Sequence, residues 1–363
     1  MFKRFLFLTL TSSLILFLSG CLLIMHIGDQ KVGWAIGWDD SGNAVILHTE
    51  DGGKTWAEQG DRTLWAGMAG NDISAADNNT AWAALGDNGG GNGAIVNTAD
   101  GGLTWQLQAI PAEATGTVKG IKALNSDIVW AVTLNGVVLR TMNGGKDWEV
   151  IPHPGVDIIQ VNRIDAKGGD VWIADVGSRN FGMIHSSDFG QTWRKEELPN
   201  LSTDPGSGPM AVSIVNDQTA WAAVRPMADI YRTQDGGTTW GKDAAEISGQ
   251  NDLDDICAPN ADLVWAVQNI GGFSGGLILK VVNNGTTFVG INSDHNPYYQ
   301  YEGITCFSEN EAWAVGFKSV TAPATMASGI IRHTENGGIT WETQDMPVDD
   351  AQLWKISFVG AHR

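Results

Sequence analysis

Short segments of alternating hydrophobic and polar residues, separated by turn residues, run along the chain from about residue 30 to its end. Residues 118–123 (Val-Lys-Gly-Ile-Lys-Ala) alternate in this way, and residues 94–98 form a similar segment ahead of a turn. A period of two residues is typical of β-strands with one buried face. Because turn residues such as Gly, Asn and Asp separate the segments, the pattern predicts an all-β protein of short antiparallel strands.

One eight-residue block recurs seven times with the general form Ser/Thr-x-Asp/Asn-x-Gly-x-Thr-Trp. The first copy is Thr49–Trp56, and the sixth, Val281–Phe288, is the most divergent. The residues at the Asp/Asn position are Asp51, Asp100, Asn143, Asp188, Asp235, Asn283 and Asn336. We interpret the block as a tight hairpin turn, because its glycine tolerates a positive φ and its Asp or Asn side chain can bond to nearby backbone.

A second block, built around a Trp that is followed by small or aliphatic residues, precedes each turn block. Its Trp residues are 42 to 49 residues apart: Trp34, Trp82, Trp130, Trp172, Trp221, Trp265 and Trp313. This spacing is that of a four-stranded propeller blade. We therefore predict an all-β fold, a seven-bladed β-propeller with four-stranded antiparallel blades, in which the turn block joins the third strand to the fourth.

Closure of the predicted ring has two candidate strands. The tail from Leu353 to Gly360 has the pattern of a first strand, but no second strand follows it. We expect this C-terminal strand to join the first blade ahead of Trp34, which would remove an exposed sheet edge. Residues 22–27 are the alternative.

The paired blocks resemble those of the Asp-box (BNR) repeat propellers over about residues 30–359. That superfamily includes sialidases, xyloglucan-active glycosidases, sortilin-type receptors and photosystem II stability/assembly factors. The seven pairs of a Trp-Ala-Val block with a Thr-x-Asp-Gly-Gly-x-Thr-Trp block are most similar to the last group and its bacterial relatives. The resemblance implies the fold and leaves the function open, because enzymes, receptors and scaffolds all carry the box.

The N-terminus has the features of an export signal. Lys3 and Arg4 precede an apolar run that ends in Leu-Ser-Gly-Cys at Cys21. This ending resembles the bacterial lipobox, which implies cleavage before Cys21 and attachment of lipid to it. We expect a signal peptide at 1–20, the lipidated Cys21 and a short tether at 21–31, and the propeller at 32–363, anchored to a membrane of the bacterial cell envelope and facing the periplasm or exterior. An uncleaved anchor helix is the alternative.

Charge and cysteine content narrow the functional classes. The chain has 22 Lys and Arg against 41 Asp and Glu, a formal net charge of -19. Nucleic acid is therefore not an expected partner, because its phosphates require clustered basic residues. Cys257 and Cys306 stand seven or eight residues before successive block Trp residues. They are either a disulfide of an exported protein or two small buried residues.

The repeat accounts for most of the conspicuous side chains. Thirteen of the 16 Trp residues lie in the two blocks, where we expect them to pack between blades. His48, His185 and His333 directly precede turn blocks on three different blades, so we expect them on a polar strand face rather than in a metal site. We expect neither metal nor cofactor.

The enzymes of the superfamily depend on catalytic side chains that we do not identify in this sequence. Sialidases combine six blades with an arginine triad, and the xyloglucan-active enzymes place their acids between two propellers. Two catalytic carboxylates must face each other across a sugar. We therefore interpret the acid pairs that are neighbours in the sequence as solvated charge: Asp39/Asp40, Asp252/Asp254 and Asp349/Asp350.

Loops at the end of the propeller opposite to the turn blocks hold most of the aromatic residues that the repeat does not explain. Residues 295–301 contain three of the four Tyr residues of the chain. Tyr suits a recognition surface, because it adds a large amphipathic contact at low entropic cost. We expect this face to bind a protein or glycan through Trp38, Trp65, Arg179, Arg225, Phe273, Tyr298, Tyr299 and Tyr301.

The function predicted from these features is that of a non-catalytic, monomeric envelope lipoprotein that acts as an interaction scaffold on a membrane. A photosystem-type assembly factor is the first alternative, and a glycoside hydrolase of the Asp-box superfamily is the second.

Overall fold

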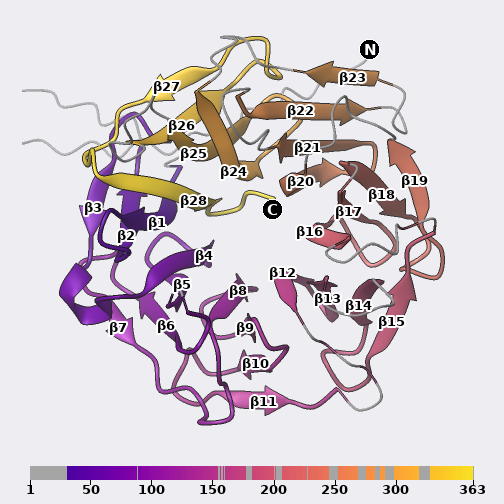
Figure 1. Ribbon diagram of the computed structural model, residues 1–363, viewed down its shortest axis with the longest axis horizontal. Coiled ribbons are helices and arrows are strands. Elements are labelled where there is room, and N and C mark those ends of the chain that lie inside the picture. Colours follow the sequence, from indigo (N-terminus) through magenta and orange to yellow (C-terminus); the bar gives the residue numbers. More distant parts are fainter. Residues whose placement is uncertain are drawn as a thin grey trace, which may run out of the picture.

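The computed structural model describes residues 31–362 except 88, 154, 155, 157, 159, 177–181, 200, 202–206, 227, 245–251, 269–274, 283–286, 291–297 and 319–327. Seven four-stranded antiparallel sheets surround a central channel (Figure 1). The prediction of a seven-bladed β-propeller is confirmed. No helix in the described part of the chain is long and apolar enough to span a bilayer.

The strands of each blade run outward from the channel in chain order, except in blade 1, whose innermost strand comes from the C-terminus. Blade 1 consists of β28 (Ala351–Phe358), β1 (Gly33–Asp39), β2 (Ala44–Thr49) and β3 (Ala57–Gln59). Blade 2 consists of β4 (Ala69–Ala75), β5 (Ala81–Gly86), β6 (Gly93–Thr98) and β7 (Gln106–Leu107). Blade 3 consists of β8 (Val118–Ala123), β9 (Val129–Thr133), β10 (Val138–Thr141) and β11 (Glu149–Ile151).

The other four blades follow the same order. Blade 4 consists of β12 (Val161–Lys167), β13 (Asp170–Asp175), β14 (Gly182–Ser186) and β15 (Arg194–Glu197). Blade 5 consists of β16 (Gly208–Ile214), β17 (Ala220–Arg225), β18 (Asp229–Thr233) and β19 (Gly241–Ala244). Blade 6 consists of β20 (Leu253–Asn260), β21 (Leu263–Gln268), β22 (Leu277–Val282) and β23 (Thr287–Gly290), and blade 7 of β24 (Tyr299–Cys306), β25 (Ala312–Lys318), β26 (Ser328–Thr334) and β27 (Glu342–Gln344).

The C-terminal strand closes the ring. β28 pairs antiparallel with β1 from Gly33 opposite Phe358 to Asp39 opposite Ala351, which confirms the expected closure by the tail. The first and last parts of the chain therefore share one sheet, and the chain after β28 continues toward the inside of the ring (Figure 1).

A Trp on the second strand of every blade forms the centre of the core. Six of these indoles have no exposed surface, and Trp172 is 2% exposed. Each stands opposite the last polar residue before the turn block: His48, Asn97, Arg140, His185, Arg232, Lys280 or His333. His185 stacks on Trp172 with ring centroids 3.7 Å apart, and the Arg232 guanidinium lies 4.9 Å from the Trp221 ring. The polar residues that precede the turn blocks thus cover the indole faces.

The Trp at the end of a turn block packs against the second-strand Trp of the preceding blade. Edge-on contacts of this kind join Trp82 to Trp148 at 5.8 Å and Trp172 to Trp240 at 5.3 Å between ring centroids. Aromatic pairs prefer this geometry. Packing between blades, as expected from the sequence, therefore explains both Trp series.

The turn blocks are held by their own side chains. In blade 1, the Asp51 carboxylate accepts a hydrogen bond from the Thr55 amide at 2.9 Å, and the Thr49 hydroxyl accepts one from the Gly53 amide at 2.8 Å. Gly52 and Gly53 have φ of 74° and 87°, a region that favours glycine. Asp100, Asp188, Asp235, Asn143 and Asn336 make the equivalent bond, and Asn283 lies outside the described residues.

Candidate functional site

A β-bulge turns one extra side chain of every innermost strand toward the channel. The pairing of each innermost strand with its neighbour skips one residue at the same place in all seven blades: Asn71, Lys119, Asn162, Met210, Asp254, Glu302 and Trp354. Bulges commonly re-aim a side chain in this way. All but Asn71 line a cavity of about 120 Å³ that is surrounded by the innermost strands.

A buried cluster of charge lies beside this cavity. The Lys355 ammonium is 2.9 Å from Oδ2 of Asp255, and the Arg163 guanidinium is 3.6 Å from its Oδ1. Burial raises the pKa of Asp255 to about 6, although the positive charge of Arg163 acts in the opposite direction. The cluster joins blades 1, 4 and 6 across the channel, so its charges serve the ring itself.

Side chains on the innermost strands also connect each blade to the next. Asp72 accepts a hydrogen bond from the Ile121 amide at 2.9 Å. Two residues further along the innermost strands, the residue opposite the second-strand Trp accepts a bond from an amide of the neighbouring blade: Ser74 from Ala123, Asp165 from Ile214, Ser213 from Ala258, and Ser357 from Ala75. These bonds fix the end of the channel that lies on the side of the turn blocks.

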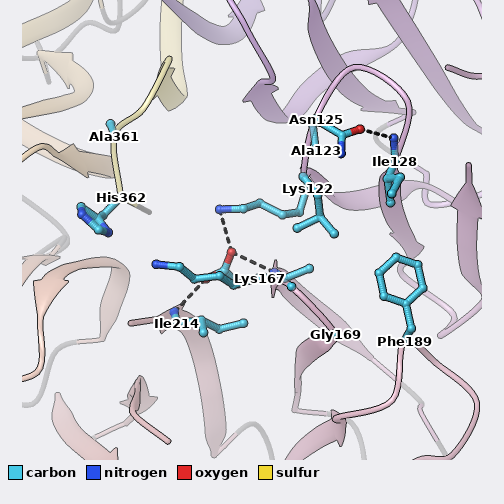
Figure 2. A pocket seen from close by; sticks show the side chains of 14 residues that line it. Lys122, Ala123, Asn125, Ile128, Lys167, Gly169, Phe189, Ile214, Ala361 and His362 are labelled. Carbon is cyan, nitrogen blue, oxygen red and sulfur yellow. Dashed lines mark hydrogen bonds and ion pairs between the residues drawn. The ribbon is translucent and has the colours of Figure 1, made fainter. Parts of the chain in front are cut away.

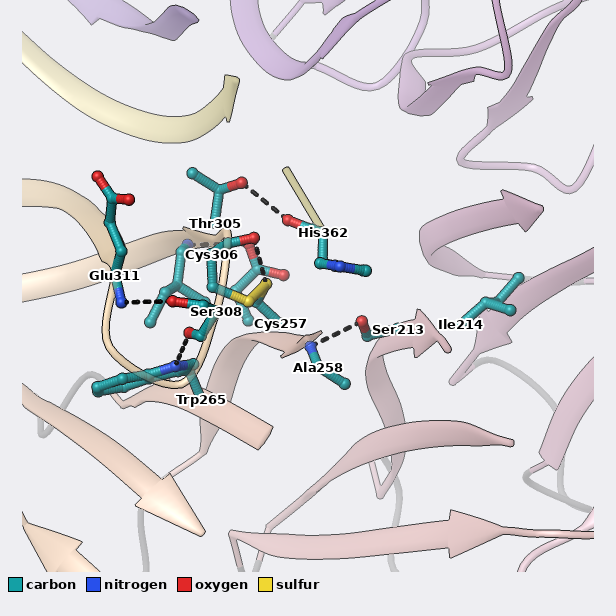
Figure 3. The surroundings of a disulfide bond; sticks show 12 residues. Ser213, Ile214, Cys257, Ala258, Trp265, Thr305, Cys306, Ser308, Glu311 and His362 are labelled. Carbon is teal, nitrogen blue, oxygen red and sulfur yellow. Dashed lines mark hydrogen bonds between the residues drawn. A yellow bond between two sulfur atoms is a disulfide. The ribbon is translucent and has the colours of Figure 1, made fainter. Parts of the chain in front are cut away.

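Cys257 and Cys306 form a disulfide at the register of these serines (Figure 3). Cys257 on β20 occupies the place that Ser213 has on β16, and Cys306 on β24 occupies the place of Ala258. Of the two alternatives that the sequence left open, the structure shows the disulfide. It replaces a hydrogen bond between blades by a covalent bond between blades 6 and 7.

A pocket of about 660 Å³ lies at this same end of the channel (Figure 2). Its floor comes from the ends of β8 and β12, with Lys122, Asp165 and Lys167, and from Ile214 at the end of β16. The turns between the first and second strands of blades 3 and 4, together with Phe189 of the fourth turn block, form its outer wall. His362 closes the opposite side.

The C-terminal tail is held in place by backbone hydrogen bonds. The His362 amide donates to the carbonyl of Cys306 at 2.7 Å, and the His362 carbonyl accepts from the Thr305 hydroxyl at 2.9 Å. Blade 7 thereby directs the imidazole toward the pocket, where Ile214 lies beyond it (Figure 3). The tail thus contributes both a ring-closing strand and a pocket residue.

The pocket combines cationic and apolar walls in a chain that is strongly acidic. The Lys122 ammonium lies 2.8 Å from the Asp165 carboxylate, and the exposed Lys167 donates to the carbonyl of Val215 at 2.8 Å. Burial lowers the pKa of His362, and the positive charges of Lys167 and Lys122 lower it further. Such a site suits an anionic group, and protonation of His362 in acid would add to its positive charge.

The same pocket lacks the arrangement that hydrolysis requires. Asp165 is the one carboxylate among its lining residues, and it is 3% exposed. Its Oδ1 accepts from the Ala166 amide and pairs with Lys122, and its Oδ2 accepts from the Ile214 amide. Because both oxygens hold the blades together, the geometry favours binding over acid–base catalysis.

Comparison with known proteins assigns the chain to a family. Residues 122–314, more than half of the chain, match the family described as Photosynthesis system II assembly factor YCF48. The chain belongs to this family. The match agrees with the resemblance carried by the two repeated blocks.

Two relatives of the YCF48-family chain differ in function. The Photosystem II assembly lipoprotein Ycf48 of Synechococcus sp. (strain CC9902) is 28% identical over 117 residues, which are 32% of this chain and 33% of that protein. A Xyloglucanase of Paenibacillus sp is 24% identical over 242 residues, which are 57% of this chain and 23% of that protein. The chain therefore spans about a third and about a quarter of the lengths of these relatives.

Solved structures agree on the fold. YCF48 bound to D1 peptide has a TM-score of 0.58 and 20% identity, over 79% of this chain and 87% of that one. YCF48 from Cyanidioschyzon merolae has a TM-score of 0.57 and 15% identity, over 78% of this chain and 92% of that one. A protein from Lactobacillus plantarum has a TM-score of 0.58 and 14% identity, over 91% of this chain and 99% of that one.

Two aromatic residues expected on the binding face of this YCF48-family propeller are core residues instead. Trp65 is 3% exposed, and its indole N–H donates to the carbonyl of Ala44 at 2.9 Å. Tyr301 is also 3% exposed and packs between blades 6 and 7 with Trp265 and Ile304. Their place in sequence, outside the repeated blocks, suggested exposure, but the loop that holds Trp65 folds inward, and Tyr301 belongs to β24, the innermost strand of blade 7.

The other expected binding residues differ in accessibility. Trp38 is half-buried, and its ring lies tilted against that of Trp354 with centroids 4.4 Å apart. Tyr298 is 37% exposed, Tyr299 is half-buried, and Arg225 lies 3.8 Å from Asp252. They lie at the end opposite to the turn blocks, as expected, whereas Cys21, Arg179 and Phe273 lie outside the described residues.

Sequence reasoning missed the residues that line the pocket. Lys122, Lys167 and His362 belong to three separate segments, and nothing in the repeat distinguishes them from other polar residues. A signal was present in the alignment of the blades, because Lys122 and Asp165 occupy positions that are Ser or Thr in four other blades.

Proposed function

We propose that this YCF48-family chain is a non-catalytic assembly factor, tethered to a membrane by lipid on Cys21, that holds an exported polypeptide segment of a membrane protein. Membership of the family favours this role over that of a generic envelope scaffold. The name of the Synechococcus relative as an assembly lipoprotein and the D1 peptide bound to a related propeller both support it.

The pocket at the turn-block end of the channel is the observation that carries the proposal. Lys122 and Lys167 provide positive charge on the floor, and Ile128, Phe189 and Ile214 provide apolar surface around it. A polypeptide segment with a carboxylate next to apolar side chains matches both surfaces. We therefore place the partner at this end of the channel, whereas the sequence placed it on the opposite face.

The glycoside hydrolase alternative finds less support in the acid pairs named from the sequence. Asp39 and Asp350 both bind the guanidinium of Arg62, at 2.9 and 3.2 Å, and Asp252 faces Arg225. Hydrogen bonds from Asn43, Ser41 and Arg62 keep the pKa of Asp39 below its usual value, against the effect of burial. A carboxylate held in this way is a poor proton donor. Burial raises the pKa of Asp252, but its charge is paired with Arg225 and, among the described residues, no second acid of the named pairs faces it.

Peptide affinity tests the proposed binding role. The probe is a fluorescent D1 peptide, titrated with the full chain in detergent and followed by anisotropy. We expect Lys167→Glu to weaken binding at least about tenfold, because it reverses a charge in the pocket. Lys54→Glu makes the same change of charge in the blade 1 turn block and should leave affinity unchanged. Equal affinity of the Lys167→Glu variant and the wild type would refute the pocket as the site.

The tether has a separate test. Cys21→Ser should release the chain from the membrane fraction or leave an uncleaved precursor, and labelling with a palmitate analogue should disappear. Labelling that persists in this variant would show that lipid is attached elsewhere or that Cys21 is not modified.

A further inference from the structure

We propose that the turn-block rim of blades 7, 1 and 2 rests on the lipid surface, with Leu103 and Ile339 inserted between the headgroups. This inference rests on the proposed lipid tether at Cys21. It defines which side of the propeller faces the membrane.

The chain enters the propeller at this rim. The Lys31 carbonyl accepts a hydrogen bond from the amide of Gly52 in the blade 1 turn block at 3.0 Å. The Lys31 ammonium pairs with Glu311 in the turn between β24 and β25 of blade 7. Lys31 is thus fixed between blades 7 and 1, on the side of the turn blocks.

The tether is short. Cys21 and Lys31 are ten residues apart in the sequence. Even a fully extended segment of that length spans at most about 35 Å, at about 3.3–3.6 Å per residue. A lipid on Cys21 would therefore hold the turn-block side of blade 1 near the bilayer, and the blades on either side of blade 1 would meet the surface first.

The tips of the two flanking turn blocks are apolar and exposed. The residue after the second glycine of the turn block is Leu103 in blade 2 and Ile339 in blade 7, and these side chains are 87% and 79% exposed. The equivalent residues of the other blades are polar: Lys54, Lys146, Gln191, Thr238 and Thr286. Leu103 and Ile339 are the two most exposed large hydrophobic side chains among the described residues.

The chemistry of the rim favours zwitterionic lipid. Lys54, between the two apolar tips, can extend its ammonium to lipid phosphates, but Glu50 and Glu335 stand in the same turns. Positive charge therefore does not dominate, and burial of Leu103 and Ile339 in the interfacial layer provides the attraction. The pocket opens on the same side, between blades 3 and 4, where it would face segments that emerge from the membrane.

The test measures the depth of single sites in the lipidated full chain on phosphatidylcholine vesicles. An environment-sensitive fluorophore is attached to Leu103→Cys or Ile339→Cys while Cys257 and Cys306 stay oxidised. Two controls are Leu64→Cys, a 61% exposed leucine at the opposite end of the propeller, and Thr238→Cys, the equivalent tip in blade 5. Spin-labelled lipid quenches the fluorescence of membrane-inserted sites.

We expect several-fold stronger quenching at positions 103 and 339 than at 64 and 238. Equal, weak quenching at all four positions on chains that float with the vesicles would overturn the rim contact and leave the tether intact. Chains that do not float with the vesicles would overturn both the tether and the contact. Loss of the quenching when a purified partner protein is added would assign the rim to protein and also overturn the proposal.

Discussion

Lys122 on β8 and Asp165 on β12 form an ion pair of 2.8 Å across the boundary between blades 3 and 4. The same carboxylate accepts a hydrogen bond from the Ile214 amide of blade 5. One buried group therefore connects three blades beneath the proposed binding pocket. We expect Asp165→Ala to lower the free energy of unfolding by about 3 kcal/mol, because it leaves a buried amide and a lysine without their partner. Chemical denaturation measures this, and Asp217→Ala, in an exposed turn, should change stability by less than about 0.5 kcal/mol.

The disulfide should stabilise the ring by restricting the unfolded chain. Cys257 and Cys306 are 49 residues apart, which corresponds to about 4 kcal/mol in the chain-entropy model. We expect thermal unfolding at a lower temperature after Cys257→Ala with Cys306→Ala. The variant with Cys257→Ser and Cys306→Ala should lose less stability. At the same register of β16, the Ser213 hydroxyl accepts a hydrogen bond from the Ala258 amide across the boundary between blades 5 and 6. Equal melting temperatures for wild type and both variants would contradict this role.

Asp255 should make stability depend on pH in an unusual direction. Its pKa is raised from 3.8 to about 6 in the folded chain. Between pH 3.8 and about 6, Asp255 is protonated in the folded state and ionised in the unfolded state. The stability that this bound proton contributes is therefore lost as pH rises through about 6. Denaturation curves of wild type and Asp255→Asn from pH 4 to 7 should show that the variant lacks this decrease. A difference between the two that is constant over the range would show that Asp255 does not titrate there.

Two tyrosines that are close in the sequence should differ in their effect on stability. Tyr301 is 3% exposed and Tyr298 is 37% exposed. We expect Tyr301→Ala to cost about 3–5 kcal/mol through a core cavity, as for a buried aromatic. Tyr298→Ala should cost less than about 1 kcal/mol. Similar losses, measured by urea denaturation, would mean that residue 298 is also packed inside.

The fold could be predicted in detail because each blade repeats the same local chemistry. Even the departures from the turn-block pattern have local causes. Asn143 replaces Asp in blade 3, and its amide donates at 2.9 Å to Asp147, which replaces Thr. The donor and acceptor have exchanged places, so the turn is conserved while two residues change together.

The candidate site could not be predicted in the same way. The pocket brings together β8, β12, β16 and the C-terminal tail, whose proximity depends on closure of the ring. The sequence identified aromatic residues outside the repeat, but the burial of Trp65 depends on how the loop between blades 1 and 2 folds over the core. Tyr301 is buried because β24 begins at Tyr299, within a segment that the sequence assigned to a loop.

Photo-crosslinking of a bound peptide tests the location of the partner site most directly. Benzoylphenylalanine is introduced at Ile128, which lines the pocket, or at Tyr298, at the opposite end of the propeller. Each full-length variant is irradiated with a labelled D1 peptide, and crosslinked product is quantified by mass spectrometry. The account predicts crosslinks from position 128 that unlabelled peptide competes away, and none from position 298. Competable crosslinks from position 298 alone would contradict it and place the partner on the face away from the turn blocks.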